Sequence, residues 1–133
     1  MLSGLRVLIV EDDAILARDL SELITGAEGI VVGPFGTVKE ARAHLKERVA
    51  IDAAVLDVSL SDGAITPVLE ALHARGIPTL VYTGGSVPDD VRGRHPALVS
   101  LSKPVRPGRL IAEIRRVSGH VSSSPAQLRQ KPG

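Results

Sequence analysis

Short apolar runs alternate along the chain with segments whose apolar residues recur every three or four positions. The first run is Arg6–Val10, and the most uniform one is Ala53–Leu56, which ends at Asp57. Runs of β-branched and aliphatic residues of this length are typical of strands buried on both faces of a parallel sheet. Three further runs complete a predicted set of five strands: Ile30–Gly33, Pro78–Thr83 and Ala97–Ser102.

Between the first three runs, the apolar spacing predicts two amphipathic helices. The first has leucine and isoleucine residues on one face between Leu16 and Ile24, at steps of three and four. Thr37 is the expected N-cap of the second helix, over 38–49. Glu40 stands three residues after it, which is the capping-box pattern.

Three more helices are predicted in the second half of the chain. Thr66 is the expected N-cap of the third helix, with Pro67 at its first position. The polar segment 86–96 contains two prolines and a glycine, so it has room for only a short fourth helix. The last helix is predicted over Pro107–Val117, and Gly119 is expected to end it.

Strands that alternate with helices predict an α/β fold with a five-stranded parallel sheet. Right-handed crossovers favour the flavodoxin-like (βα)5 arrangement, with strand order 2-1-3-4-5. Residues 1–119 are predicted to form one domain. Residues 120–133 are rich in serine and proline and are expected to be a flexible C-terminal tail.

Composition excludes several classes of site. The 133 residues contain no cysteine, so disulfides and cysteine-ligated metals are excluded. Phe35 and Tyr82 are the only aromatic residues, which argues against a base-stacking nucleic-acid platform. The net charge of +1 divides into −5 over residues 1–66 and +6 over 67–133, an asymmetry best explained by solvated faces. No membrane-length apolar stretch or signal peptide is seen, so a cytoplasmic location is expected.

Polar residues stand at the ends of four predicted strands. Glu11 and Asp12 follow the first strand, Asp57 the third, Thr83 the fourth and Lys103 the fifth. The carboxyl ends of parallel strands meet at one edge, so these residues are expected to lie together. Carboxylates gathered at one place repel one another unless a cation lies among them, and their oxygens suit Mg²⁺ or Mn²⁺. A cation, a hydroxyl and a lysine would hold phosphoryl oxygens, and Asp57 could form an acyl phosphate.

Taken singly, each of these residues has a purely structural explanation. Acids after the first strand favour a helix N-terminus. Asp57 could cap a loop, Thr83 is an ordinary strand residue, and Lys103 could be a surface residue. Their joint placement at four strand ends favours a functional site.

The motifs at these strand ends resemble those of bacterial response-regulator receiver domains. The matching segments are Val7–Asp13, Val55–Leu60, Tyr82–Gly84 and Lys103–Pro104, and the likeness covers residues 5–118. Each segment alone is a weak signal, but their combination is specific. The resemblance implies a signalling domain of two-component systems that is controlled by phosphorylation.

The resemblance also implies a metal site with a defined set of ligands. Mg²⁺ would be bound by the side chains of Asp12 and Asp57 and by the backbone carbonyl of Ser59. Glu11 would bind it through a water molecule. Mn²⁺ is the alternative cation.

The family also implies the roles of the reacting residues. Asp57 would receive the phosphoryl group from a histidine kinase or a histidine phosphotransfer protein. Thr83 and Lys103 would each contact a phosphoryl oxygen. Acceptance and hydrolysis would be self-catalysed, so the protein is not expected to be an enzyme with a turning-over substrate.

Two features depart from the usual receiver pattern. The position three residues before Lys103, where receivers usually carry Tyr or Phe, is Ser100, and the fourth helix is short. Both features resemble a subgroup of alphaproteobacterial stand-alone receivers with a Phe-Ala-Thr-Gly motif, which here reads Val81–Gly84. The prediction is a single-domain response regulator that signals to an unknown downstream protein, without a DNA-binding output domain or membrane contact. The alternatives are a phosphorylation-independent, receiver-like interaction module and a small metal-dependent phosphatase.

Overall fold

A five-stranded parallel sheet lies at the centre of the computed structural model, in the predicted order β2-β1-β3-β4-β5. The structure describes residues 2–57, 65–83, 89–94, 98–103 and 106–122. The strands are β1 (Arg6–Val10), β2 (Ile30–Phe35), β3 (Ala53–Asp57), β4 (Thr79–Thr83) and β5 (Val99–Ser102).

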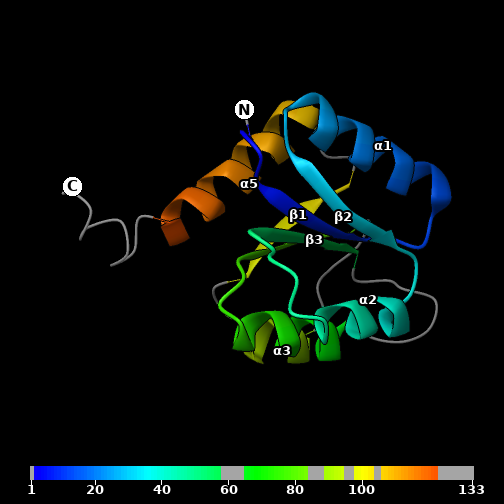
Figure 1. The fold of residues 1–133 in the computed structure, drawn as a ribbon. Coiled ribbons are helices and arrows are strands. Elements are labelled where there is room, and N and C mark those ends of the chain that lie inside the picture. Colours follow the sequence, from blue (N-terminus) through cyan, green and yellow to red (C-terminus); the bar gives the residue numbers. More distant parts are fainter. Residues whose placement is uncertain (1, 58–64, 84–88, 95–97, 104–105, 123–133) are drawn as a thin grey trace.

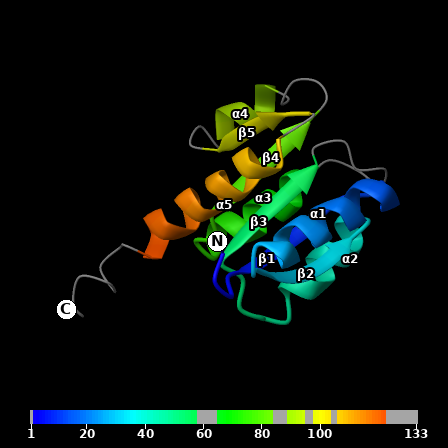
Figure 2. The ribbon, with the colours of Figure 1, turned by 90° about the horizontal axis from the view of Figure 1, so that it is seen from above.

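Helices cover both faces of the sheet, and α1 and α5 lie on the face opposite α2 and α3 (Figure 1). From above, α1 runs along the β1–β2 side of the sheet and α5 along the β4 side (Figure 2). This two-sided covering explains why β3 is buried along its whole length. The helices are α1 (Ala14–Gly26), α2 (Val38–Leu45), α3 (Thr66–Ala74), α4 (Asp89–Arg94) and α5 (Pro107–Ser122).

The sheet separates the interior into two apolar clusters. Successive strand residues point to opposite faces, so Leu8 and Leu56 pack on the α2–α3 side. Ile9 and Val55 pack on the α1–α5 side together with Ile114 of α5. The two clusters hold the strands in a fixed register, and that register brings the carboxyl ends of β1, β3 and β4 to one edge.

Side-chain caps begin the first two helices. The Asp13 carboxylate accepts hydrogen bonds from the backbone N–H groups of Ile15 and Leu16, at 2.9 and 3.1 Å. Thr37 caps α2 as predicted, because its hydroxyl accepts from the Glu40 N–H at 3.0 Å. The Glu40 carboxylate accepts from the N–H of Gly36 at 3.1 Å.

The structure corrects three predicted helix boundaries. Thr66 is the first residue of α3 and the N-cap position is Ile65, which makes no side-chain cap bond. Helix α2 ends at Leu45, before 49, and Arg48 beyond it has a left-handed backbone with φ +59°. Helix α5 continues through Gly119 to Ser122, because a glycine inside a helix weakens it without ending it.

Two strand boundaries also differ from prediction. Strand β2 continues past Gly33 and Pro34 to Phe35. Gly33 has φ +104°, and a Cβ there would lie 3.1 Å from the Ile9 carbonyl oxygen, so only glycine fits this turn of the strand. Strand β4 begins at Thr79, although the Pro78 carbonyl still accepts from the Ala54 N–H at 3.0 Å. The predicted start of β5 at Ala97 lies outside the described residues.

No helix in the described part of the chain has the length and apolar character needed to cross a membrane.

Candidate functional site

The carboxyl edge of the sheet brings together four of the predicted site residues. Glu11 directly follows β1, Asp57 is the last residue of β3, and Lys103 directly follows β5. The side chains of Glu11 and Asp57 are buried, whereas Asp12 is exposed to solvent. The site therefore has a buried floor and an open rim, as expected at a sheet edge that receives a ligand.

Three carboxylates form a candidate metal centre. Glu11, Asp12 and Asp57 each offer one oxygen, and these oxygens all lie within 4.8 Å of one another. Opposite ligands of an octahedral Mg²⁺ are about 4.2 Å apart. The cluster thus fits a small, hard cation if one side chain moves slightly or binds through water. The donor set, oxygen atoms only, agrees with the predicted preference for Mg²⁺ or Mn²⁺.

The Lys103 ammonium lies between two of these acids. Its Nζ atom is 3.4 Å from Oδ2 of Asp57 and 3.7 Å from Oε1 of Glu11. About a quarter of the lysine side chain is exposed, and the two carboxylates are nearly fully buried. The lysine therefore offsets part of the negative charge of the cluster and remains accessible from the rim.

Glu11 has further hydrogen-bond partners. Its Oε2 atom accepts from the backbone N–H of Asp13 at 2.9 Å, and its Oε1 atom accepts from the Tyr82 hydroxyl. Burial nevertheless raises the pKa of the Glu11 carboxyl above its ordinary value of 4.5, and the charge of Asp57 adds to this effect. Burial and the bond to Glu11 also raise the pKa of the Tyr82 phenol, so the hydroxyl keeps its proton and donates.

This raised pKa predicts how stability depends on pH. Above pH 4.5 the unfolded chain loses the Glu11 proton, while the folded protein keeps it up to its higher pKa. The stability of the metal-free protein is therefore expected to fall as pH rises through this window. Denaturant unfolding with a chelator present, in wild type and Glu11→Gln, measures the difference.

Glu11→Gln should remove this part of the slope. Glu22→Gln, which changes an exposed acid of α1, should leave it intact. Parallel pH profiles for the wild type and Glu11→Gln would contradict the prediction.

The contacts of two predicted site residues lie outside the part of the chain that the structure describes. Ser59 lies outside the described residues. Thr83 is the last residue of β4, where its backbone pairs with Ser102 of β5, but its side chain is outside the description. The metal and phosphoryl contacts expected of these two residues remain predictions.

Tyr82 also reaches the site, in a role that the sequence did not predict. This residue stands opposite Asp57 in the β3–β4 pairing, and its hydroxyl reaches Glu11 across the intervening strand. The sequence signal that could have indicated this role is a tyrosine one residue before the end of a buried strand, where its hydroxyl needs a polar partner. Ser100, which stands where receivers usually carry Tyr or Phe, is exposed on β5.

Comparison with protein families matches residues 7–115 to the response regulator receiver domain. SdrG from Sphingomonas melonis Fr1 is 37% identical, with a TM-score of 0.72, and the alignment covers 89% of this chain and 98% of SdrG. A comparison with curated proteins finds no match.

Two other solved structures share the fold at lower identity. A CheY-like receiver domain protein from Methanospirillum hungatei JF-1 is 24% identical, with a TM-score of 0.80 and coverage of 91% of this chain and 98% of that one. The receiver domain of the sensor histidine kinase PA1611 from Pseudomonas aeruginosa PAO1 is 20% identical, with a TM-score of 0.74 and coverage of 87% and 98%. That structure has a magnesium ion coordinated in its active-site cleft.

Proposed function

The chain belongs to the response regulator receiver domain family, and from this premise we propose that it is a phosphorylation switch with Asp57 as the acceptor. The phosphoryl donor would be the phosphohistidine of a histidine kinase or a histidine phosphotransfer protein. The phosphorylated protein would then bind a downstream protein or pass the group onward in a phosphorelay.

The placement of Asp57 is the observation that carries this proposal. Its carboxylate ends a buried strand, with two further acids close by and the Lys103 ammonium at 3.4 Å. Positioned cations that neutralise phosphoryl oxygens are the main requirement of phosphoryl transfer. An isolated structural acid would need none of these neighbours.

The chemistry follows from this arrangement. An oxygen of the Asp57 carboxylate attacks phosphorus, the P–N bond of the phosphohistidine breaks, and its electron pair stays on the imidazole nitrogen. As the acyl phosphate forms, the Lys103 ammonium leaves the Asp57 carboxylate and pairs with a phosphoryl oxygen. A bound Mg²⁺ would be held by Asp12 and Asp57, with Glu11 through water, and would neutralise the remaining oxygen charge. Attack by water on phosphorus later restores Asp57.

Labelling with a small phosphodonor tests the proposal without the unknown kinase. Incubation of the wild type with acetyl phosphate and Mg²⁺ should add one phosphoryl group, measured as a mass gain by intact-protein mass spectrometry. Excess chelator should suppress labelling by about 100-fold or more, since the acidic cluster then lacks its neutralising cation. Mn²⁺ should restore it. Equal labelling with and without the metal would contradict the magnesium-dependent mechanism.

A second candidate function is binding to a partner independently of phosphorylation. Two observations favour it: Ser100 is exposed on β5, where receivers usually carry an aromatic residue, and α4 spans six residues. Proteins that co-purify with the wild type and with Asp57→Ala to the same extent would support this function. Proteins retained only by the phosphorylated wild type would support the switch.

A further inference from the structure

Tyr82 contacts two of the charged groups around Asp57. Its hydroxyl donates to Oε1 of Glu11, and the centre of its ring lies 4.6 Å from Nζ of Lys103. Tyr82 is 5% exposed and the Glu11 side chain is nearly fully buried, so the bond between them is shielded from water, which strengthens a hydrogen bond to a carboxylate. Lys103 remains partly exposed, and its ammonium is attracted to the face of the ring.

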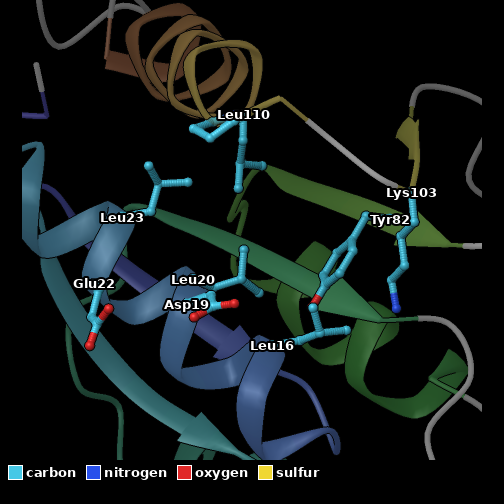
Figure 3. A pocket seen from close by; sticks show the side chains of 9 residues that line it. Leu16, Asp19, Leu20, Glu22, Leu23, Tyr82, Lys103 and Leu110 are labelled. Atoms are coloured by element: carbon cyan, nitrogen blue, oxygen red, sulfur yellow. The ribbon is translucent and has the colours of Figure 1, made fainter.

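The Tyr82 side chain also borders a second space. A groove of about 850 Å³ runs between α1 and α5, and Tyr82 and Lys103 line it together with apolar residues such as Leu16 and Leu110 (Figure 3). The ring lies against this groove, and the hydroxyl reaches the acidic cluster. Packing in the α1–α5 cluster thus fixes the ring, and the ring in turn fixes the hydroxyl.

We propose that Tyr82 is a positioning residue of the phosphoryl-acceptor site. Its hydroxyl orients the Glu11 carboxylate toward the cation, and its ring holds the Lys103 ammonium between Glu11 and Asp57. This role rests on the proposed function, and it separates into two parts. The hydroxyl governs cation affinity, whereas the ring governs the placement of the lysine that meets the phosphoryl group.

Two substitutions separate these parts. Tyr82→Phe removes the hydroxyl and keeps the ring, so it should weaken Mg²⁺ binding, measured by titration calorimetry, about fivefold or more. Once Mg²⁺ is saturating, its labelling rate with acetyl phosphate should return to within about twofold of the wild type. Tyr82→Leu also removes the ring, and it should lower the labelling rate roughly threefold or more even at saturating Mg²⁺.

Ser118→Ala is the matched control. It also removes a buried hydroxyl, one that donates to the Ile114 carbonyl at 2.7 Å on α5. Its Mg²⁺ affinity and labelling rate should stay within about twofold of the wild type. Equal losses in Tyr82→Phe and Ser118→Ala would assign the effect to general destabilisation and overturn the positioning role. Unchanged Mg²⁺ affinity in Tyr82→Phe would overturn it as well.

The wild type carries a direct spectroscopic reporter of this contact. Tyr82 is the single tyrosine of the chain, which has no tryptophan. A carboxylate that accepts a phenol hydrogen bond quenches tyrosine emission, and a cation that draws on Glu11 weakens this quenching. Emission should therefore rise with Mg²⁺ and saturate, with a midpoint equal to the calorimetric Kd. If calorimetry shows that Mg²⁺ binds but the tyrosine emission does not change, the proposal is overturned.

These results distinguish the two proposals from each other. A wild type that is labelled and binds Mg²⁺, beside a Tyr82→Phe variant with the same affinity and rate, overturns the positioning role and leaves the proposed function standing. A wild type that neither binds Mg²⁺ nor takes the label overturns both.

Discussion

Asp57→Ala is expected to abolish phosphorylation by acetyl phosphate, leaving less than about one part in a hundred of the wild-type label. No other carboxylate combines burial at a strand end with an ammonium at 3.4 Å among the described residues. Asp12 is exposed, and Glu11, although buried and 3.7 Å from the same ammonium, has one oxygen bonded to the Asp13 N–H and the other to the Tyr82 hydroxyl. Mass spectrometry of the intact protein and of its peptides measures the extent and the position of labelling.

Asp52→Ala is the matched control for this loss. Asp52 is exposed just before β3, at the opposite end of the strand from Asp57, and its carboxylate accepts the Arg6 N–H at 2.8 Å. The variant also loses one carboxylate, but it should be labelled like the wild type. Label retained by a folded Asp57→Ala protein would place the acceptor at another residue and refute the proposed function.

Ile114→Ala is expected to lower the free energy of unfolding by about 2–5 kcal/mol. The Ile114 side chain is fully buried on α5 and packs in the cluster between that helix and the sheet. The truncation deletes three buried methyl or methylene carbons. It leaves a cavity between α5 and the sheet that the strands cannot close. Since whole domains are stable by roughly 5–15 kcal/mol, this is a large fraction of the total.

Ile15→Ala provides the same chemical change on the surface. Ile15 lies in the first turn of α1 and is 67% exposed, so its truncation opens no cavity. Its unfolding free energy should stay within about 0.5 kcal/mol of the wild type. Urea unfolding followed by circular dichroism compares the two. Equal effects of the two substitutions would contradict the burial of α5 against the sheet.

The hydrophobic pattern was sufficient to predict the sheet order and the edge that carries the site. Five apolar runs and right-handed connections leave few arrangements, so the order β2-β1-β3-β4-β5 was predicted correctly. Glu11, Asp12 and Asp57 were expected to meet because they follow strands that end at the same edge, and they do. The Thr37 cap was predicted because its partner is only three residues away.

Features set by tertiary contacts could not be predicted in this way. The bond between Tyr82 and Glu11 joins residues 71 positions apart, and nothing local to either residue indicates it. Glycine at 119 was expected to end α5, but the helix continues to Ser122. Strand β2 was expected to end at Gly33, but it continues to Phe35, which pairs with Val10 of β1, and this pairing exists only in the folded sheet.

The separation of the interior into two clusters has a consequence for how this protein can change. Each face of the sheet has its own set of strand side chains, Leu8 and Leu56 on one side and Ile9 and Val55 on the other. A substitution in the α2–α3 cluster therefore acts on a different set of packing contacts from those around Tyr82 and Ile114. We expect the two layers to tolerate substitutions largely separately, because the strand backbone is what they share.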